Sequence, residues 1–366
     1  MFDLSLRQML VGGAAVAVLG VVAVAVFALS GLYNVSASRE HFDATTWLLD
    51  LVRRQSIRTH SLGVGDPPRQ SAGAVRLGAV HYELGCAACH GAPGRPASAL
   101  QDAMLPSPPP FTDGVRRWSP KQLYWIVLNG QKYTGMPSWV APRRRDEIWP
   151  MVAFLTRLSA LDAAAYRELA GLGEGRRGPG LELGTGRTLL EVCARCHGAP
   201  GAAPPIDMVP SLSGQSHAYL ARALREYAEG KRPSGYMQLV AADLDDDVIR
   251  ELAAAYAQAP APPPSGTPTA NAALLRRGEA IAREGLPGKG VPACLACHVD
   301  AGNPAFPRIL GLPAHYVEQQ LQLFQTGKRH ASAFGAIMGA VSSRLDPDDM
   351  EAVAAYLSAV PAGEAR

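Results

Sequence analysis

Three copies of one pentapeptide, Cys-x-x-Cys-His, stand out in this sequence, and together they use all 6 of its cysteines. The spacing puts two thiols on one side of a helical turn, where both can add to the vinyl groups of one porphyrin. The histidine that follows is then held under the iron as its proximal ligand. The sequence therefore predicts three covalently attached haem c groups. The expected attachment cysteines are Cys86 and Cys89, Cys193 and Cys196, and Cys294 and Cys297, and the proximal histidines are His90, His197 and His298.

Other uses of paired cysteines fit this pattern less well. Structural zinc needs two such pairs roughly 15–20 residues apart, whereas the second and third pairs here are 101 residues apart (294 − 193). Disulfide frameworks belong to short secreted chains, and a thioredoxin-like motif needs a strand–helix–strand context that is absent here. Haem attachment is favoured, with zinc and redox thiols as the remaining alternatives.

Length and charge set broad limits on the fold and its partners. A chain of 366 residues is long enough for two to four domains, and a hydrophobic content of 48% can fill their cores. The net charge is only +3 and there is no basic tract, so nucleic acid is not an expected partner.

The N-terminus carries a long uncharged stretch. No charged residue occurs from Gln8 to Ser38, and Met9 to Leu32 is apolar or small throughout. About 20 such residues span the hydrocarbon core of a membrane, whereas a signal sequence has an apolar stretch of about 7–15. We therefore expect residues 8–32 to be a retained transmembrane anchor. The segment Val35-Ser36-Ala37 can also be read as a cleavage site, so an N-terminal signal stays open.

Whether the N-terminal segment is an anchor or a signal, it predicts that the rest of the chain is exported from the cytoplasm. Haem attachment needs reduced thiols and delivered haem on the outer side of the bacterial inner membrane, so we expect an inner-membrane protein with its haem domains in the periplasm. Residues 33–71 form a linker that includes the amphipathic segment Trp47–Arg54. This segment can lie on the membrane surface, on the first domain, or as an ordinary surface helix.

The three motifs divide the remainder into three helical units, residues 72–162, 181–260 and 271–360. Glycine-rich residues 171–180 follow the first unit, and proline-rich residues 259–270 separate the second from the third. No alternating strand pattern is evident, so the predicted fold class is all-α. The expected helices are 75–84, 120–128 and 145–158 in the first unit, 183–192, 218–229 and 246–258 in the second, and 272–283, 316–325 and 348–359 in the third.

The second and third units are an internal repeat. Cys193, His197 and Met237 recur as Cys294, His298 and Met338, each at an offset of 101 residues (for instance 338 − 237). A repeat of this length indicates duplicated domains rather than a solenoid of small repeats.

Each unit also offers one methionine as the second axial ligand of its iron. Met136, Met237 and Met338 lie 40 to 46 residues after their histidines (237 − 197 and 136 − 90), in a loop expected to fold back over the free haem face. A thioether ligand raises the reduction potential relative to a second histidine. Core packing is the alternative for any single methionine. Met104 and Met208 are assigned to packing, and His81, His217 and His315 are weaker candidates for a second histidine ligand.

A proximal histidine normally donates its other ring N–H to an acceptor. Proline carbonyls are good candidates, because proline has no backbone N–H while its C=O remains free. We expect the acceptors to be Pro109 or Pro110, Pro210 and Pro307.

These residues resemble class I cytochrome c domains. The last two units are similar to the tandem diheme cytochromes c of bacterial respiratory chains, and the first resembles a separate single-haem branch. The third unit departs from the pattern, with Val299 where glycine follows the first two motifs and an insertion at Gly285–Gly290. The stretches that carry the likeness are Cys193–Gly198, Pro210–Gln215, Tyr219–Leu220, Gly230–Arg232, Met237 and Asp243–Leu244, with Gly135–Pro137 and Trp139 in the first unit.

The resemblance implies an N-terminal transmembrane helix followed by three class I cytochrome c domains, acting in electron transfer rather than catalysis. The implied partners are a dehydrogenase or quinol-oxidising complex as donor and a terminal oxidase as acceptor. A looser resemblance is to triheme cytochrome subunits of membrane-bound dehydrogenases, which makes a permanent subunit the first alternative. A haem peroxidase is the second, if the third haem lacks Met338. Lys231-Arg232, Lys328-Arg329 and Arg143–Arg145 are candidates for partner docking or ordinary surface charge.

Overall fold

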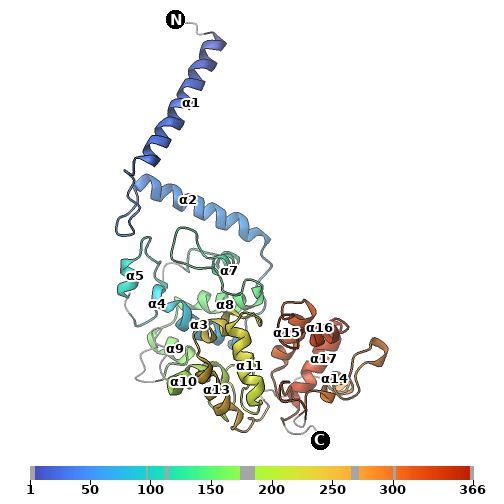
Figure 1. Ribbon diagram of the computed structural model, residues 1–366. Helices are drawn as coiled ribbons and strands as arrows, with labels where there is room; N and C mark the ends of the chain where they lie inside the picture. The colour runs from blue at the N-terminus through green and yellow to red at the C-terminus, as the bar shows by residue number, and fades with distance from the viewer. Residues whose placement is uncertain are drawn as a thin grey trace.

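The computed structural model describes residues 5–95, 98–111, 115–173, 186–264, 272–299 and 302–362. Across these ranges the chain is built of helices, and extended backbone pairs only in isolated bridges, Ala92 with Arg95 and Leu286 with Val291. The predicted all-α class is therefore confirmed. Figure 1 shows helix α1 projecting away from the body, with the three motif-bearing units following in chain order.

Helix α1 (Leu6–Leu29) is the long apolar element predicted from the N-terminus. It begins at a capping box in which the Ser5 side chain accepts from the Gln8 N–H and the Gln8 side chain accepts from the Ser5 N–H. None of its residues is buried. By length and composition α1 qualifies as a membrane span, and its place near the N-terminus also fits a signal sequence.

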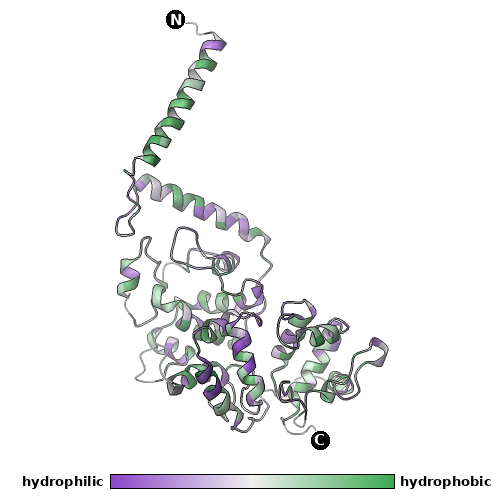
Figure 2. Cartoon of the chain, viewed as in Figure 1, coloured by the Kyte–Doolittle hydropathy of each residue, from purple (hydrophilic) through white to green (hydrophobic). Residues whose placement is uncertain are grey.

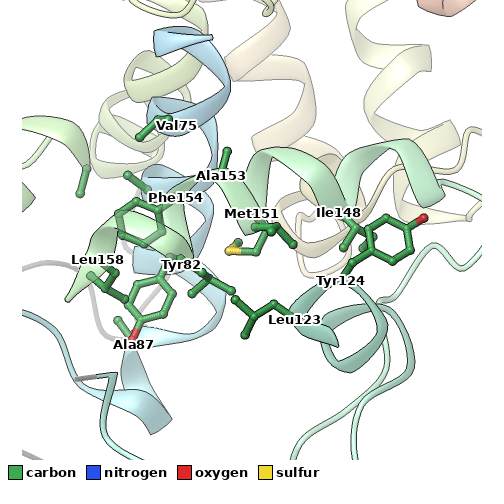
Figure 3. Close-up of a cluster of buried hydrophobic side chains, with 14 of the residues drawn as sticks. Val75, Tyr82, Ala87, Leu123, Tyr124, Ile148, Met151, Ala153, Phe154 and Leu158 are labelled. Atoms are coloured by element: carbon green, nitrogen blue, oxygen red, sulfur yellow. The ribbon is translucent and has the colours of Figure 1, made fainter. Parts of the chain in front are cut away.

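The first domain is built around two crossing helices, α3 and α8, whose apolar faces form its core. Figure 3 shows Tyr82 of α3 beside Phe154 of α8, and Ile148 farther along α8 beside Tyr124. Tyr166 lies beyond the expected end of this unit at residue 162, yet it packs into the same core, which continues to Leu172. The helices from the linker through the first domain are α2 (Asp43–His60), η1 (Ser61–Gly63), α3 (Ala72–Gly85), α4 (Ala87–His90), α5 (Ala99–Ala103), α7 (Pro120–Asn129), η2 (Arg145–Glu147), α8 (Ile148–Leu158) and α9 (Ala163–Leu169).

The second and third domains repeat one order of helices, as the internal repeat predicts. The second domain contains α10 (Gly186–His197), α11 (His217–Ala228), α12 (Gly235–Ala241) and α13 (Asp246–Ala257). The third contains α14 (Ala272–Glu284), η3 (Pro287–Lys289), η4 (Cys294–Ala296), α15 (Ala314–Gln325), α16 (Gly335–Ser342) and α17 (Pro347–Ala359). The expected start of the helix at 183, most of the glycine-rich segment and the end of the proline-rich spacer lie outside the described residues.

The predicted helices are present with ends shifted by a few residues, but one prediction is wrong. The segments that carry Met237 and Met338 were expected to be loops and are the short helices α12 and α16. Ser234 caps α12, because its side chain accepts from the backbone N–H of Met237. Helices of two turns have too few residues for a periodic apolar pattern, so their caps are the main signal in the sequence.

The second domain contacts both of its neighbours. Leu77 and Val80 of α3 form an apolar cluster with Ile206 and Val209 of the second domain. On the other side, Gln215 donates to the backbone carbonyl of Arg308 (2.8 Å) and accepts from its N–H (3.0 Å). The second motif consequently lies in the middle of the three-domain assembly.

Two helices cross at a glycine in the first domain and again in the third. The pairs are α3 with α8 at Gly78 and α14 with α17 at Gly278. A Cβ added at Gly78 would overlap the carbonyl oxygen of Pro150 and lie 2.7 Å from the Cβ of Phe154. In the third domain, a Cβ at Gly278 would overlap the carbonyl oxygen of Ala352 in the same way. Only glycine lets these helix backbones approach so closely.

We predict that Gly78→Ala lowers the free energy of unfolding of the first domain by about 1–3 kcal/mol, the usual cost of overpacking a core. The methyl group would push α3 away from α8 at the crossing. Guanidinium unfolding followed by tryptophan fluorescence measures the change. The control is Gly63→Ala, where no atom lies within 4 Å of the added Cβ; an equal loss in both variants would contradict the crossing as the cause.

Candidate haem c sites

Each motif histidine makes the same contact with a proline carbonyl. His90 Nδ1 lies 3.0 Å from the carbonyl oxygen of Pro109, and His197 Nδ1 lies 2.8 Å from that of Pro210. In the third domain His298 Nδ1 lies 2.8 Å from the carbonyl oxygen of Pro307. All three predicted acceptors are confirmed, with Pro109 chosen over Pro110.

This contact prepares each imidazole to bind a metal. A carbonyl oxygen can only accept, so Nδ1 must carry the proton and Nε2 is left as the free lone pair. Burial lowers the pKa of His197 and of His298, which favours the neutral ring that a metal requires. The carbonyl also fixes the direction of the ring and increases its basicity as a ligand.

The described residues give little support to a zinc or redox centre at the motif thiols. Burial raises the pKa of Cys86 to about 12 and that of Cys193 to about 11, whereas reactive thiols have a lowered pKa. Throughout the described ranges, no three His, Cys, Asp or Glu side chains come together as possible metal ligands. The described residues therefore do not favour structural zinc or redox-active thiols, the two alternatives that the sequence left open.

A cavity of about 690 Å³ opens beside the second motif. It falls within the usual range of about 300–1,000 Å³ for cofactor sites and is lined mainly by apolar side chains. Cys193, Cys196 and His197 line it together with Met237, so the structure brings this methionine to the same space as its motif. The neighbouring domains complete the wall, with Leu77, Val80 and His81 from the first and Leu312 and Tyr316 from the third.

Arg232 supplies a buried positive charge to this cavity. Its side chain donates to the hydroxyls of Tyr219 (3.2 Å) and Tyr316 (2.7 Å), and its Nε has no partner among the described residues. An apolar cavity with paired thiols, an imidazole and an uncompensated guanidinium matches an apolar macrocycle that carries carboxylates. The residues present thus fit haem c.

Three of the arginines proposed for docking are in fact interior. Arg232 is 4% exposed and Arg329 is 7% exposed, so neither can meet an incoming partner as surface charge. Arg144 is likewise buried, at 5%. Charge alone could not distinguish these residues from solvated ones, because their burial depends on contacts between domains.

The other two candidate methionines lie on differently built segments. In the first domain the Gln131 N–H donates to the Met136 carbonyl (3.1 Å), which closes a tight loop, and Tyr133 within it has a φ of 61°. In the third domain Phe334 precedes α16, and its ring meets that of Phe306 at 4.8 Å. Phe306 in turn lies beside the ring of His298, so a pair of aromatic rings connects the third motif to the helix of Met338.

The competing ligands are placed as follows. Met208 packs against the apolar cluster between the first two domains, which agrees with its predicted packing role, and it also lines the cavity of the second motif. Met104 lies against the backbone of Gly135, so it is close to the loop of Met136. His217 and His315 are exposed, which agrees with their expected surface role, although His315 also lines the cavity of the second motif.

His81 lies between two domains rather than beside its own motif. Its ring packs against Trp139 and Tyr236, each with centroids 4.8 Å away, and it lines the cavity of the second motif. Burial lowers its pKa to about 4, so the ring is neutral at ordinary pH. The aromatic trio connects the segment after Met136 to the residue before Met237.

Glu147 is the functional residue that the sequence did not reveal. This carboxylate belongs to the first domain and is 3% exposed. It accepts from the Ser234 hydroxyl (2.7 Å) and the Gly235 N–H (2.6 Å), at the N-terminus of the helix that carries Met237. Trp139 Nε1 also donates to it (3.1 Å). A carboxylate at a helix N-terminus is favourable because the first backbone N–H groups point toward it.

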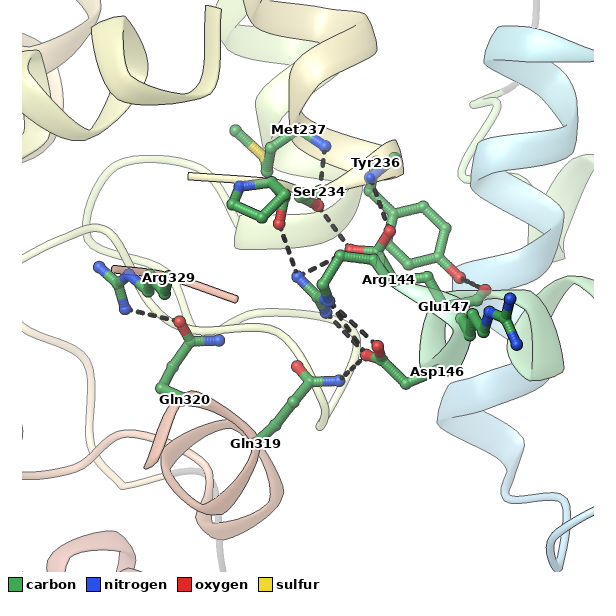
Figure 4. Close-up of polar contacts among 12 residues, drawn as sticks. Arg144, Asp146, Glu147, Ser234, Tyr236, Met237, Gln319, Gln320 and Arg329 are labelled. Carbon is green, nitrogen blue, oxygen red and sulfur yellow. Dashed lines mark hydrogen bonds and ion pairs between the residues drawn. The ribbon is translucent and has the colours of Figure 1, made fainter. Parts of the chain in front are cut away.

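Arg144 provides the opposite charge and extends the junction to all three domains. It pairs with Glu147 (3.0 Å) and Asp146 (2.8 Å) and donates to the carbonyl of Pro233 (3.0 Å). Gln319 of the third domain donates to Asp146 (2.8 Å). Figure 4 shows this network running from α12 to α15 through one short segment of the first domain.

Two family models match separate parts of the chain. The model for "Cytochrome C oxidase, cbb3-type, subunit III" matches residues 73–155, and the model for "Cytochrome c" matches residues 276–361. These spans coincide with the core of the first domain and with most of the third.

Curated relatives match about half of the chain. The "Thiosulfate dehydrogenase electron acceptor" of Thiomonas intermedia (strain K12) is 36% identical over 174 residues, 46% of this chain and 78% of the relative. Cytochrome c4 of Pseudomonas aeruginosa is 31% identical over 180 residues, 48% of this chain and 87% of the relative. The cytochrome c4 structure from Acidithiobacillus ferrooxidans is 33% identical and covers 46% of this chain and 98% of its own, with a TM-score of 0.41.

The site geometry and these relatives agree. The cytochrome c domains carry covalent haem c, for which the chain provides three cysteine pairs. This chain belongs to the multi-domain class I cytochromes c, as an electron carrier related to cytochrome c4 that is not itself an enzyme.

Proposed function

We propose that this chain is a three-haem electron relay anchored in the bacterial inner membrane, with its haem domains in the periplasm. It would carry electrons from a membrane or periplasmic dehydrogenase, or a quinol-oxidising complex, to a terminal acceptor such as an oxidase. The observation that carries the proposal is the repeated histidine-to-proline-carbonyl contact, which prepares one imidazole in each of three domains.

Each domain contributes a complete set of ligands in this proposal. The paired cysteines would hold haem c through thioether bonds, and the motif histidine, through Nε2, and a methionine thioether would bind its iron. Haem c, when bound, supplies a reversible one-electron couple. With two protein ligands on each iron, the residues leave no position for a substrate, which supports transfer over peroxidase chemistry. The proposed methionines are Met136, Met237 and Met338.

The relatives suggest the class of donor. One relative is named an electron acceptor of thiosulfate dehydrogenase, so we infer that a dehydrogenase of a comparable small periplasmic substrate reduces this chain. The match of residues 73–155 to a subunit of cbb3-type oxidase favours a second candidate, in which the chain is a permanent subunit of a membrane complex.

Purification of the full chain from native membranes in mild detergent separates these candidates. For a free relay we expect the mass of the chain to include three haems and its spectra to be low-spin. We also expect no stoichiometric partner to co-purify. A co-purifying dehydrogenase or oxidase subunit would instead make it a permanent subunit. Two haems per chain, or a high-spin ferric haem that binds cyanide, would overturn the relay as proposed.

Exchanging a methionine tests the ligand assignment. We predict that Met237→His lowers one of the three reduction potentials, within the range of about 0.8 V over which axial ligands set haem potentials, because methionine raises the potential relative to histidine. Potentiometric titration with optical detection measures it. Met208→Leu should leave all three unchanged, and Met104→Leu should leave the first haem unchanged; a shift in that variant would reassign the ligand of the first domain.

Glu147→Gln tests the link between the first domain and Met237. The amide would place a donor against the Gly235 or Trp139 N–H and leave the buried Arg144 with less compensation. We predict a loss of about 3–5 kcal/mol in the free energy of unfolding. The ferric charge-transfer band that reports methionine–iron bonding should also weaken for one haem.

The matched control is Glu251→Gln on the exposed face of α13, where we expect a change within about 0.5 kcal/mol. If the charge-transfer band of the Glu147 variant is unchanged while stability falls, Glu147 holds the domains together without positioning Met237.

A further inference from the structure

Helix α2, Asp43–His60, packs on the first domain through Ile57 and through the side that carries Arg53. The Arg53 guanidinium lies over the ring of Trp118, 5.9 Å from its centroid, and both Arg53 and Arg54 pair with Asp50 on the same helix. Near the end of the helix, Ile57 is 1% exposed, and the ring of His60 meets that of Trp125 at 5.6 Å. Contacts with α7 and η1 fix α2 to this domain.

The apolar side of the same helix faces outward. Leu48 and Val52, one turn apart, are 51% and 57% exposed, and the neighbouring Trp47 is 62% exposed. Phe42, just before the helix, is 69% exposed. Figure 2 shows hydrophobic and hydrophilic residues alternating along α2.

The N-terminal half of α2 therefore exposes large apolar side chains, whereas an amphipathic helix of a soluble protein packs its apolar stripe inward. A run of exposed large apolar side chains on one element marks an interaction surface. The sequence left open whether this segment lies on the membrane or on the first domain. The two sides of the helix allow both at once.

The position of α2 in the chain identifies what covers it. It begins 13 residues after α1 ends (residues 30–42), and Figure 1 shows it running across the end of α1 rather than continuing its axis. A helix that lies across the end of a membrane span is parallel to the membrane surface. Tryptophan, leucine and valine on one side, with arginines on the other, is the composition of helices that lie in the lipid headgroup region.

We propose that α2 lies in the periplasmic headgroup layer of the bilayer, with Trp47, Leu48 and Val52 in contact with lipid and the side that carries Arg53 and Ile57 on the first domain. The inference rests on the membrane anchoring given under the proposed function. It deepens that function, because a helix bound to both lipid and domain holds the first haem motif at a fixed height above the membrane. The first domain would then be presented to membrane partners in one orientation rather than on a flexible linker.

Lipid photolabelling of the full-length holoprotein tests this proposal. The protein is reconstituted in vesicles of phosphatidylcholine and phosphatidylglycerol that contain a phospholipid with a diazirine on its acyl chain, and labelled peptides are mapped by mass spectrometry. We expect label on α1 and on residues 42–52. The double variant Leu48→Glu, Val52→Glu should lose the label on α2 and keep that on α1. The matched control is Leu100→Glu, which changes a 56% exposed leucine elsewhere in the first domain and should keep both labels.

The outcomes separate this inference from the anchor. Label on α1 without label on α2 overturns the interfacial helix and leaves the anchored relay intact. Label on α2 in a protein that lacks α1 supports the interfacial helix and shows that the N-terminal segment was a signal. Label on neither helix overturns both.

Discussion

The hydrogen bond from each motif histidine to a proline carbonyl is the constraint on which the three sites depend. The motif itself only places two thiols and an imidazole on one turn of chain. The carbonyl determines which nitrogen is protonated, which way the ring faces, and that Nε2 is free. Because the acceptor lies 9 to 19 residues beyond the histidine, this bond also closes the loop that must wrap the cofactor.

The second domain shows how the three units act as one body. Its cavity is walled by side chains from both neighbours, and the helix of Met237 starts on a carboxylate from the first domain. A buried carboxylate persists only where donors and an opposite charge compensate it, and Glu147 has both. The ligand environment of the central site therefore depends on the assembly of domains and not on one domain alone.

Much of the fold could be predicted, and the failures share one cause. The long helices on either side of each motif have enough residues to show an apolar period, so their existence and approximate ends were correct. Helices α12 and α16 are too short for such a pattern. Arg232 and Arg329 were assigned to the surface, because a charged residue in a sequence does not show whether another domain covers it. Spacing assigned Met104 to packing and Met136 to the iron, yet the structure places Met104 against Gly135, next to Met136.

The sequence by itself determined the chemistry: three cysteine pairs, three histidines, the proline acceptors and an N-terminal apolar helix, since each is carried by local residue type and spacing. The tertiary structure decided how those parts are connected. Only packing between domains brings Glu147 to α12 and His81 to a neighbouring domain's cavity. Packing also places Arg53 and Ile57 of α2 on the first domain and leaves Leu48 and Val52 uncovered. Such contacts join residues far apart in the chain, and no local pattern encodes them.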